Sequence, residues 1–246
     1  MKSFKIIKNK PVIIILLFII LILSLIIYTA KTNESFTGVS GNIYNFRTVI
    51  VDAGHGGADG GTTGSDGSVE KEINLQIAQK LNRLLCLYGF NVIMTRENDD
   101  SIHSDDSATL RQKKISDIHN RMKIINENPD AIFVSIHQNH FADMSVHGTQ
   151  VFYSKNNPMS QALAQKIQDS VAQNIQPDNM RQIKKSGTEI YLLYNSKSPS
   201  IMVECGFMSN KNDLSLLHDD NYQKKIALSI ADGILNFYKE SDTDGS

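Results

Sequence analysis

The chain has 246 residues, of which 41% are hydrophobic and 21% are charged. These values are typical of a globular protein and exclude disorder as the default interpretation. The formal net charge is -1, so no broad basic field exists and a nucleic-acid partner is not expected. Two cysteines, Cys86 and Cys205, are too few for a disulfide framework. We expect both to be buried thiols.

The first 30 residues differ in composition from the rest of the chain. Lysines at positions 2, 5, 8 and 10 precede an apolar run from Val12 to Ile27. This run is near the lower limit of about 17 residues for crossing a bilayer, and its basic flank predicts a cytoplasmic N-terminus. We expect an uncleaved membrane anchor over residues 1–30, with the rest of the chain on the extracytoplasmic side. A cleavable signal peptide is the alternative, although residues 28–30 (YTA) form a poor cleavage site.

The remaining chain predicts one domain. Residues 31–45 are a short polar linker, residues 46–240 have no repeat and no Pro- or Ser-rich break, and residues 241–246 form a polar tail. Apolar and β-branched stretches predict strands at residues 48–51, 90–95, 131–136, 148–153 and 200–203. Apolar residues at helical spacing predict helices at about 73–84, 110–126, 163–171 and 226–234. This alternation is typical of an α/β fold with a mostly parallel sheet and helices on both faces.

Three predicted strands end next to a side chain suited to metal binding or proton transfer. His55, His137 and Glu204 each follow a strand, and Glu70 stands where a glycine-rich loop runs into the first helix. Ligands in open α/β sheets bind beyond the carboxyl ends of the strands, so these four residues converge. Two imidazoles and one carboxylate are a common catalytic zinc set, and mixed nitrogen and oxygen ligands favour zinc over calcium or magnesium.

The residues alone also allow a structural role for these side chains, without a bound metal. A single histidine after a strand is usually a hydrogen-bonding residue, and the long spacing between His55, Glu70 and His137 does not by itself identify a metal site. The glycine-rich loop lacks the Gly-Lys-Ser/Thr ending of a phosphate loop, so we interpret it as a turn that brings His55 and Glu70 together. The other histidines are expected to be surface or structural residues: His103, His119, His140, His147 and His218.

Five segments in order resemble the zinc-dependent N-acetylmuramoyl-L-alanine amidases of the Amidase_3 family. They are residues 51–57 (VDAGHGG), 70–75 (EKEINL), 95–96 (TR), 135–139 (SIHQN) and 203–210 (VECGFMSN). The resemblance extends over about residues 47–238 and implies a six-stranded, mainly parallel sheet. It implies that His55, Glu70 and His137 bind zinc and that Glu204 is the catalytic carboxylate. The implied reaction is hydrolysis of the amide between N-acetylmuramic acid and L-alanine in peptidoglycan.

A narrower resemblance is to the germination-specific, CwlD-type amidases of spore-forming bacteria. It rests on a short N-terminal segment followed directly by a lone amidase domain, and on residues 121–126 (RMKIIN) before the third strand. It implies removal of peptides from muramic acid, so that muramic δ-lactam forms in the spore cortex and germination can proceed. His140 stands where the family commonly has a small residue, and Cys205, beside Glu204, is at a position that the chemistry does not require. No long insertion could serve as an autoinhibitory helix, so we expect control by expression or by a regulatory protein partner.

Other functions remain to be compared with this one. A wall-binding module that has lost catalysis would keep the fold, although all four functional positions are present here. A different zinc hydrolase, such as a peptidase or deacetylase, would use a similar ligand set. A structural membrane protein with a buried polar cluster is the third alternative, and it would bind no metal.

Overall fold

The computed structural model describes residue 19 and residues 47–243. The predicted anchor and linker, residues 1–45, therefore lie outside the described residues apart from Ile19. None of the helices in the described part of the chain is both long and apolar enough to cross a membrane.

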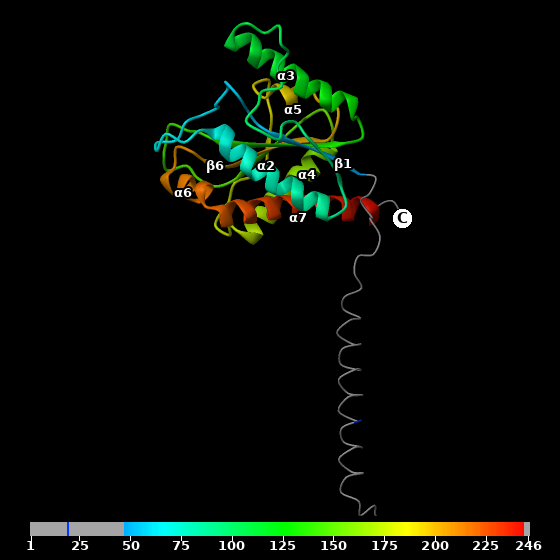
Figure 1. Cartoon of the computed structure of the whole chain (residues 1–246). Helices are drawn as coiled ribbons and strands as arrows, with labels where there is room; N and C mark the ends of the chain where they lie inside the picture. The colour runs from blue at the N-terminus through cyan, green and yellow to red at the C-terminus, as the bar shows by residue number, and fades with distance from the viewer. Residues whose placement is uncertain (1–18, 20–46, 244–246) are drawn as a thin grey trace, which may run out of the picture. The chain divides into compact units, whose positions relative to one another are not determined.

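A six-stranded sheet forms the centre of the domain (Figure 1). Its order is β2-β1-β3-β6-β4-β5, and every neighbouring pair is parallel except β4 and β6. The prediction of an α/β fold with a mostly parallel, six-stranded sheet is confirmed. The strands are β1 (Thr48–Ala53), β2 (Asn91–Met94), β3 (Ile132–Asn139), β4 (Gln150–Tyr153), β5 (Lys184–Lys185) and β6 (Ser200–Phe207).

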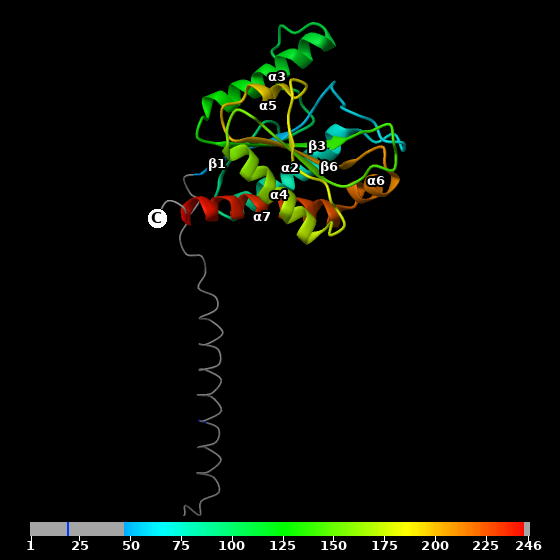
Figure 2. The ribbon, with the colours of Figure 1, turned by 180° about the vertical axis from the view of Figure 1, so that it is seen from behind.

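Helices cover both faces of this sheet, as Figures 1 and 2 show from opposite sides. One face carries α2 (Glu70–Leu87), α4 (Met159–Asn174) and α7 (Asp220–Thr243), and the other carries α3 (Leu110–Glu127) and α5 (Tyr191–Asn195). Side chains alternate along a strand, so Val49 and Val51 join the larger core beneath α2, α4 and α7. Ile50 joins a smaller core beneath α3 and α5. Packing on both faces fixes the position of the sheet and of the edge that carries the candidate site.

The three elements that the sequence pattern did not predict are short. They are β5, with two lysines, α5, with five residues, and α6 (Lys211–His218). Segments of this length do not complete enough turns or alternations to show a period. Helix α7 also continues to Thr243, past the predicted start of the polar tail at residue 241. A helix satisfies its own backbone hydrogen bonds, so it can extend beyond its last apolar residue.

Two further expectations need correction. His137 and Glu204 lie within β3 and β6 rather than after them, and they are register partners. Both strands continue past their apolar runs because the backbone hydrogen bonds between strands do not require apolar side chains. Cys205 is buried as predicted, but Cys86 is exposed. Cys86 follows the buried Leu85 on α2, and the helical turn of about 100° per residue points it away from the core.

Candidate functional site

His55, Glu70 and His137 meet at the carboxyl-terminal edge of the parallel strands. One ligand atom from each lies within 4.8 Å of the others. His55 Nε2 is 3.3 Å from Glu70 Oε2, and His137 Nδ1 is 2.9 Å from Glu70 Oε1. The two imidazole centroids are 4.9 Å apart. The glycine-rich loop thus does bring His55 and Glu70 together.

Glu70 is held in place at the first residue of α2, where its side chain is buried. Its carboxylate accepts hydrogen bonds from the backbone N–H groups of Thr62 and Gln138, at 2.9 and 3.1 Å. Burial alone raises the pKa of Glu70, but the hydrogen bonds and charges of His137 and His55 hold it well below its usual value. Glu70 is therefore a fixed anion, also favoured by its place at a helix N-terminus.

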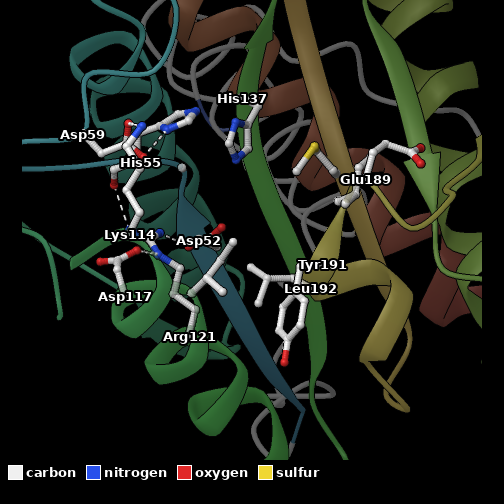
Figure 3. Close-up of a pocket in the computed structure, with 14 residues that line it drawn as sticks. Asp52, His55, Asp59, Lys114, Asp117, Arg121, His137, Glu189, Tyr191 and Leu192 are labelled. Atoms are coloured by element: carbon white, nitrogen blue, oxygen red, sulfur yellow. Dashed lines mark hydrogen bonds and ion pairs between the residues drawn. The ribbon is translucent and has the colours of Figure 1, made fainter. Parts of the chain in front are cut away.

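His55 is oriented from behind by a second carboxylate. Its Nδ1 is 2.9 Å from Asp59 Oδ2, and Asp59 Oδ1 is 2.6 Å from Lys114 Nζ on α3 (Figure 3). Burial lowers the pKa of His55, but Asp59 and Glu70 outweigh that effect and raise the pKa to about 9. A carboxylate on the far nitrogen is how proteins fix the tautomer and orientation of metal-binding histidines. Nε2 of His55 then faces Glu70.

Gly54 makes room for the ring of His137. A Cβ built on Gly54 would lie 2.2 Å from His137 Nε2, far inside a van der Waals contact. The ring therefore lies directly against the backbone of the loop, with Nδ1 turned toward Glu70. Any side chain at position 54 would move this imidazole.

Two buried arginines bind three consecutive carbonyl groups of the loop that carries His55. Arg96 donates to the oxygens of Ala53 and Gly54 at 2.8 and 3.1 Å. Arg121 donates to the oxygens of Ala53 and His55 at 2.9 and 2.7 Å. Both arginines lie in segments noted in the sequence, but no role was assigned to either. The sequence pattern did not predict that these two charged side chains would be buried.

Glu204 lies beside this cluster on the same face of the sheet, because it is the register partner of His137. Its Oε2 is buried and has no hydrogen-bond partner among the residues that the structure describes. Burial raises the pKa of Glu204 to about 7, against the opposing charge of His137. A carboxyl group with a pKa near neutrality can both accept and donate a proton under physiological conditions.

The donor set fits a zinc ion. Two imidazole nitrogens and one carboxylate oxygen are the usual ligands of a catalytic zinc site, and their separations allow one ion to reach all three. Two further features fit such a site: the carboxylate of Asp59 orients the His55 ring, and Glu204 Oε2 has no hydrogen-bond partner among the described residues. The remaining histidines do not join the cluster: His103 is half-buried, and His119, His140, His147 and His218 are exposed.

A cavity of about 270 Å³ opens next to the cluster, between α3 and α5 (Figure 3). His55 and His137 form part of its wall, and we call it the α3–α5 cavity. It was not predicted from the sequence, because α5 itself was not. Its other lining residues are Asp52, Gly54, Asp59, Lys114, Asp117, Ile118, Arg121, Glu189, Ile190, Tyr191, Leu192 and Met202.

Known proteins resemble the chain over most of its length. Residues 49–236 match the family described as N-acetylmuramoyl-L-alanine amidase. The germination-specific N-acetylmuramoyl-L-alanine amidase of Bacillus subtilis (strain 168) is 33% identical over 229 residues, which cover 92% of this chain and 93% of that protein.

Solved structures give the same result. The CwlD amidase of Clostridioides difficile, solved in complex with the GerS lipoprotein, is 40% identical, with a TM-score of 0.76 over 78% of this chain and 98% of that one. The amidase AmiC2 of Nostoc punctiforme is 30% identical, with a TM-score of 0.68 over 81% and 99%. The chain therefore belongs to the N-acetylmuramoyl-L-alanine amidase family, and it is an enzyme that hydrolyses the amide between N-acetylmuramic acid and L-alanine in peptidoglycan.

Proposed function

We propose that this amidase depends on zinc, that His55, Glu70 and His137 bind the ion, and that Glu204 is the catalytic acid and base. The observation that carries the proposal is the convergence of two imidazoles and a buried carboxylate one strand away from an unpartnered carboxyl group. A bound zinc ion supplies Lewis-acid chemistry: it lowers the pKa of water and polarises a carbonyl group.

Glu204 moves the proton in this proposal. Its carboxylate accepts a proton from the attacking water, whose oxygen forms the new bond to the lactyl carbonyl carbon. Glu204 then donates that proton to the L-alanine nitrogen as the carbon–nitrogen bond breaks. The raised pKa of about 7 suits both halves of this transfer. No covalent bond between enzyme and substrate is required.

The test is digestion of purified peptidoglycan by the full-length chain, with a chelator, with added zinc, and with both. We expect zinc-dependent release of peptides that begin with L-alanine, identified by mass spectrometry. A peptidase would release fragments cut within the stem peptide, and a deacetylase would release acetate. Either product in place of L-alanine peptides would contradict the proposal, as would full activity after complete removal of the metal.

We further propose that the substrate is spore cortex, where removal of the peptide lets muramic δ-lactam form. The similarity to the germination-specific amidase of Bacillus subtilis, which extends over nearly the whole of both chains, supports this assignment. Deletion of the gene in its own host should yield spores with little muramic δ-lactam and poor germination. Normal δ-lactam content in such spores would contradict this proposal and indicate that the enzyme acts on the vegetative wall.

The proposed layout places the enzyme outside the cytoplasm. Residues 1–30 act as a membrane anchor, residues 31–45 as a linker, residues 46–240 as the catalytic domain and residues 241–246 as a tail. The basic flank and the apolar run in the sequence support the anchor. Membrane fractionation of the full-length chain and of a chain starting at residue 31 tests it: only the former should sediment with membranes.

A protein partner completes the proposal. The Clostridioides difficile amidase was solved in complex with a lipoprotein, and it is 40% identical to this chain. We propose that a regulatory protein binds this amidase as well. Co-purification of the tagged enzyme from sporulating cells, compared with its His137→Ala variant, would identify the partner and show whether binding needs an intact metal site.

A further inference from the structure

The bond that this enzyme cuts joins two chemically different halves. One half is a glycan strand of neutral N-acetylated sugars, since the muramic acid carboxyl group is itself part of the amide. The other is a stem peptide, whose D-glutamyl and terminal residues carry free carboxylates. The two halves must leave the reaction centre in different directions, so the surfaces that flank it should differ in charge.

The α3–α5 cavity is the flank without a free cation. Its cationic side chains are already bound: Lys114 Nζ lies 2.6 Å from Asp59, Arg121 binds Asp117 at 2.6 Å and also Asp52, and His55 Nδ1 lies 2.9 Å from Asp59. A further acidic residue, Glu189, accepts a hydrogen bond of 2.9 Å from the backbone N–H of Gly187. The lining thus has four acidic residues and no cation that is left for a ligand. Such a cavity offers the carboxylates of a peptide no partner and tolerates a neutral sugar.

The wall of the cavity on the α5 side is apolar and ends in an exposed aromatic ring. Met202, Ile190 and Leu192 line the interior. Tyr191 stands at the mouth with 37% of its surface exposed, and its ring centroid lies 5.6 Å from that of His119 on α3. The weakly positive C–H bonds of one face of a pyranose ring pack well on the negative face of such a ring.

Tyr191 also lines a second depression, on the outer side of the same two helices. This outer hollow, of about 450 Å³, is lined by His119, Met122, Lys123, Asn126, Glu127 and Tyr191. Amide and charged side chains beside an aromatic ring offer hydrogen bonds to sugar hydroxyl and N-acetyl groups. Because Tyr191 lines both, its side chain is the point at which the cavity and the outer hollow meet.

The opposite flank of Glu204 carries positive charge. Gln150 on β4 is the register partner of Glu204 and donates a hydrogen bond of 2.9 Å to the oxygen of Gln182. The preceding residue, Arg181, has its guanidinium 4.8 Å from the ring centroid of Phe207, and its Nε has no hydrogen-bond partner among the described residues. An unpaired arginine suits the carboxylates of a stem peptide.

We propose that the path from the α3–α5 cavity to the outer hollow binds the glycan strand, with Tyr191 as the platform on which a sugar ring stacks. This inference rests on the proposed function, because it assumes that the reaction occurs at the cluster of His55, Glu70, His137 and Glu204. The stem peptide leaves over β4, toward Arg181. Tyr191 therefore determines recognition of the glycan rather than of the peptide.

The test measures binding without catalysis. Isothermal titration calorimetry of the full-length chain uses a neutral tetrasaccharide of N-acetylglucosamine, and separately the free stem peptide. Tyr191→Ala should weaken tetrasaccharide binding by about five- to ten-fold, the usual scale of one aromatic contact. Tyr191→Phe keeps the ring and should bind as the wild type does. Tyr194→Ala, on the same helix but outside both hollows, is the matched control.

Three outcomes would overturn the glycan path. They are no tetrasaccharide binding by the wild type, unchanged binding by Tyr191→Ala, or a loss confined to the free stem peptide. Circular dichroism of each variant identifies any loss that comes from misfolding, and in that case Tyr191→Leu, which keeps bulk without an aromatic face, replaces it. Peptidoglycan digestion is measured in parallel. A chain that binds the tetrasaccharide through Tyr191 but releases no L-alanine peptide would contradict the proposed function and leave the glycan path intact.

Discussion

Arg121 Nη2 donates a hydrogen bond of 2.7 Å to the backbone oxygen of His55. His55 is the single non-glycine residue with a positive φ, 62°, in the described part of the chain. Left-handed backbone is unfavourable for a residue with a Cβ, so it needs support from its surroundings. Arg121 provides that support from α3, on the opposite side of the loop from Glu70. The conformation of one proposed metal ligand thus depends on a helix that contributes none of the three proposed ligands.

Replacing Arg121 should weaken metal binding before it removes the fold. Arg121→Lys keeps one positive charge near Asp52, but a single ammonium cannot span the carbonyls of Ala53 and His55 as the guanidinium does. We expect zinc affinity, measured by competition with a coloured chelator, to fall by about 10- to 100-fold, the scale of lost outer support at metal sites.

Arg111→Lys is the control for this prediction, because Arg111 lies on the same helix and is exposed. It should leave zinc affinity unchanged. Equal affinities for the wild type and Arg121→Lys would show that the loop holds His55 without the arginine. Arg121→Met would leave Asp52 as an unpaired buried charge, which costs about 3–5 kcal/mol, so its failure to fold would not be informative.

The alternation of strands and helices could be predicted from the sequence because each long element repeats an apolar residue at its own period. The meeting of His55, Glu70 and His137 followed from the rule that strand ends share one edge, but their proposed role as zinc ligands came from the resemblance to a family. The contribution of α5 could not be predicted, since five residues show no period. Neither could the hydrogen bonds of Arg121, which join residues 66 and 68 positions apart.

Gly54 should tolerate no side chain. In Gly54→Ala the new Cβ would overlap the ring of His137, which must then rotate or shift away from Glu70. We expect loss of most zinc binding and activity, with a destabilisation of about 1–3 kcal/mol from the overpacked contact. The measurements are zinc stoichiometry after gel filtration and the urea unfolding midpoint.

Gly67→Ala is the control for Gly54→Ala, because it adds backbone strain without a contact to a metal-site side chain. Gly67 has a φ of 87°, but a Cβ there would meet nothing within 4 Å. Its substitution should cost about 1 kcal/mol of stability and leave zinc stoichiometry unchanged. If Gly54→Ala binds zinc as well as Gly67→Ala does, the close packing of His137 against the loop is not required.

The stability of the fold should fall in acid through Asp52. Burial raises the pKa of this carboxyl, but Arg121, Ser135, His137 and Thr95 outweigh it and hold the pKa below its usual value. A carboxyl whose pKa is lower in the folded state stabilises the fold fully above its unfolded pKa, about 3.9. That contribution disappears as the pH falls through the folded value.

Urea unfolding of the wild type and of Asp52→Asn at pH 7, 5, 4 and 3 measures this contribution. The wild type should be the more stable protein at pH 7 and 5, and the difference in unfolding free energy should shrink below pH 4. Comparing the two proteins at each pH cancels the other carboxyl groups. A difference that stays constant from pH 7 to pH 3 would mean that the charge of Asp52 does not stabilise the fold.

Removing Glu204, the proposed acid–base group, should separate catalysis from metal binding. In Glu204→Gln the side chain keeps its size but can no longer exchange a proton, so we expect the rate of peptide release to fall by about 10²- to 10⁴-fold. Zinc stoichiometry should stay at the wild-type value, because Glu204 is not one of the three proposed ligands. Glu72→Gln, an exposed position on α2, should behave as the wild type does. Retained turnover in Glu204→Gln would contradict the assignment of Glu204 as the catalytic acid and base.

Zinc should also stabilise the folded chain, and His137 should be required for that effect. An ion that binds only the folded state raises the unfolding free energy by about 2.7 kcal/mol at a free concentration 100 times its Kd. Thermal unfolding of the wild type should therefore shift upward with added zinc and return when a chelator is added. His137→Ala removes one of three ligands, and it should show no shift at the same zinc concentration. His140→Ala, three residues away on the surface, should keep the full shift. An equal shift in His137→Ala would mean that the stabilising ion binds elsewhere, and the three-residue cluster would lose its thermodynamic support.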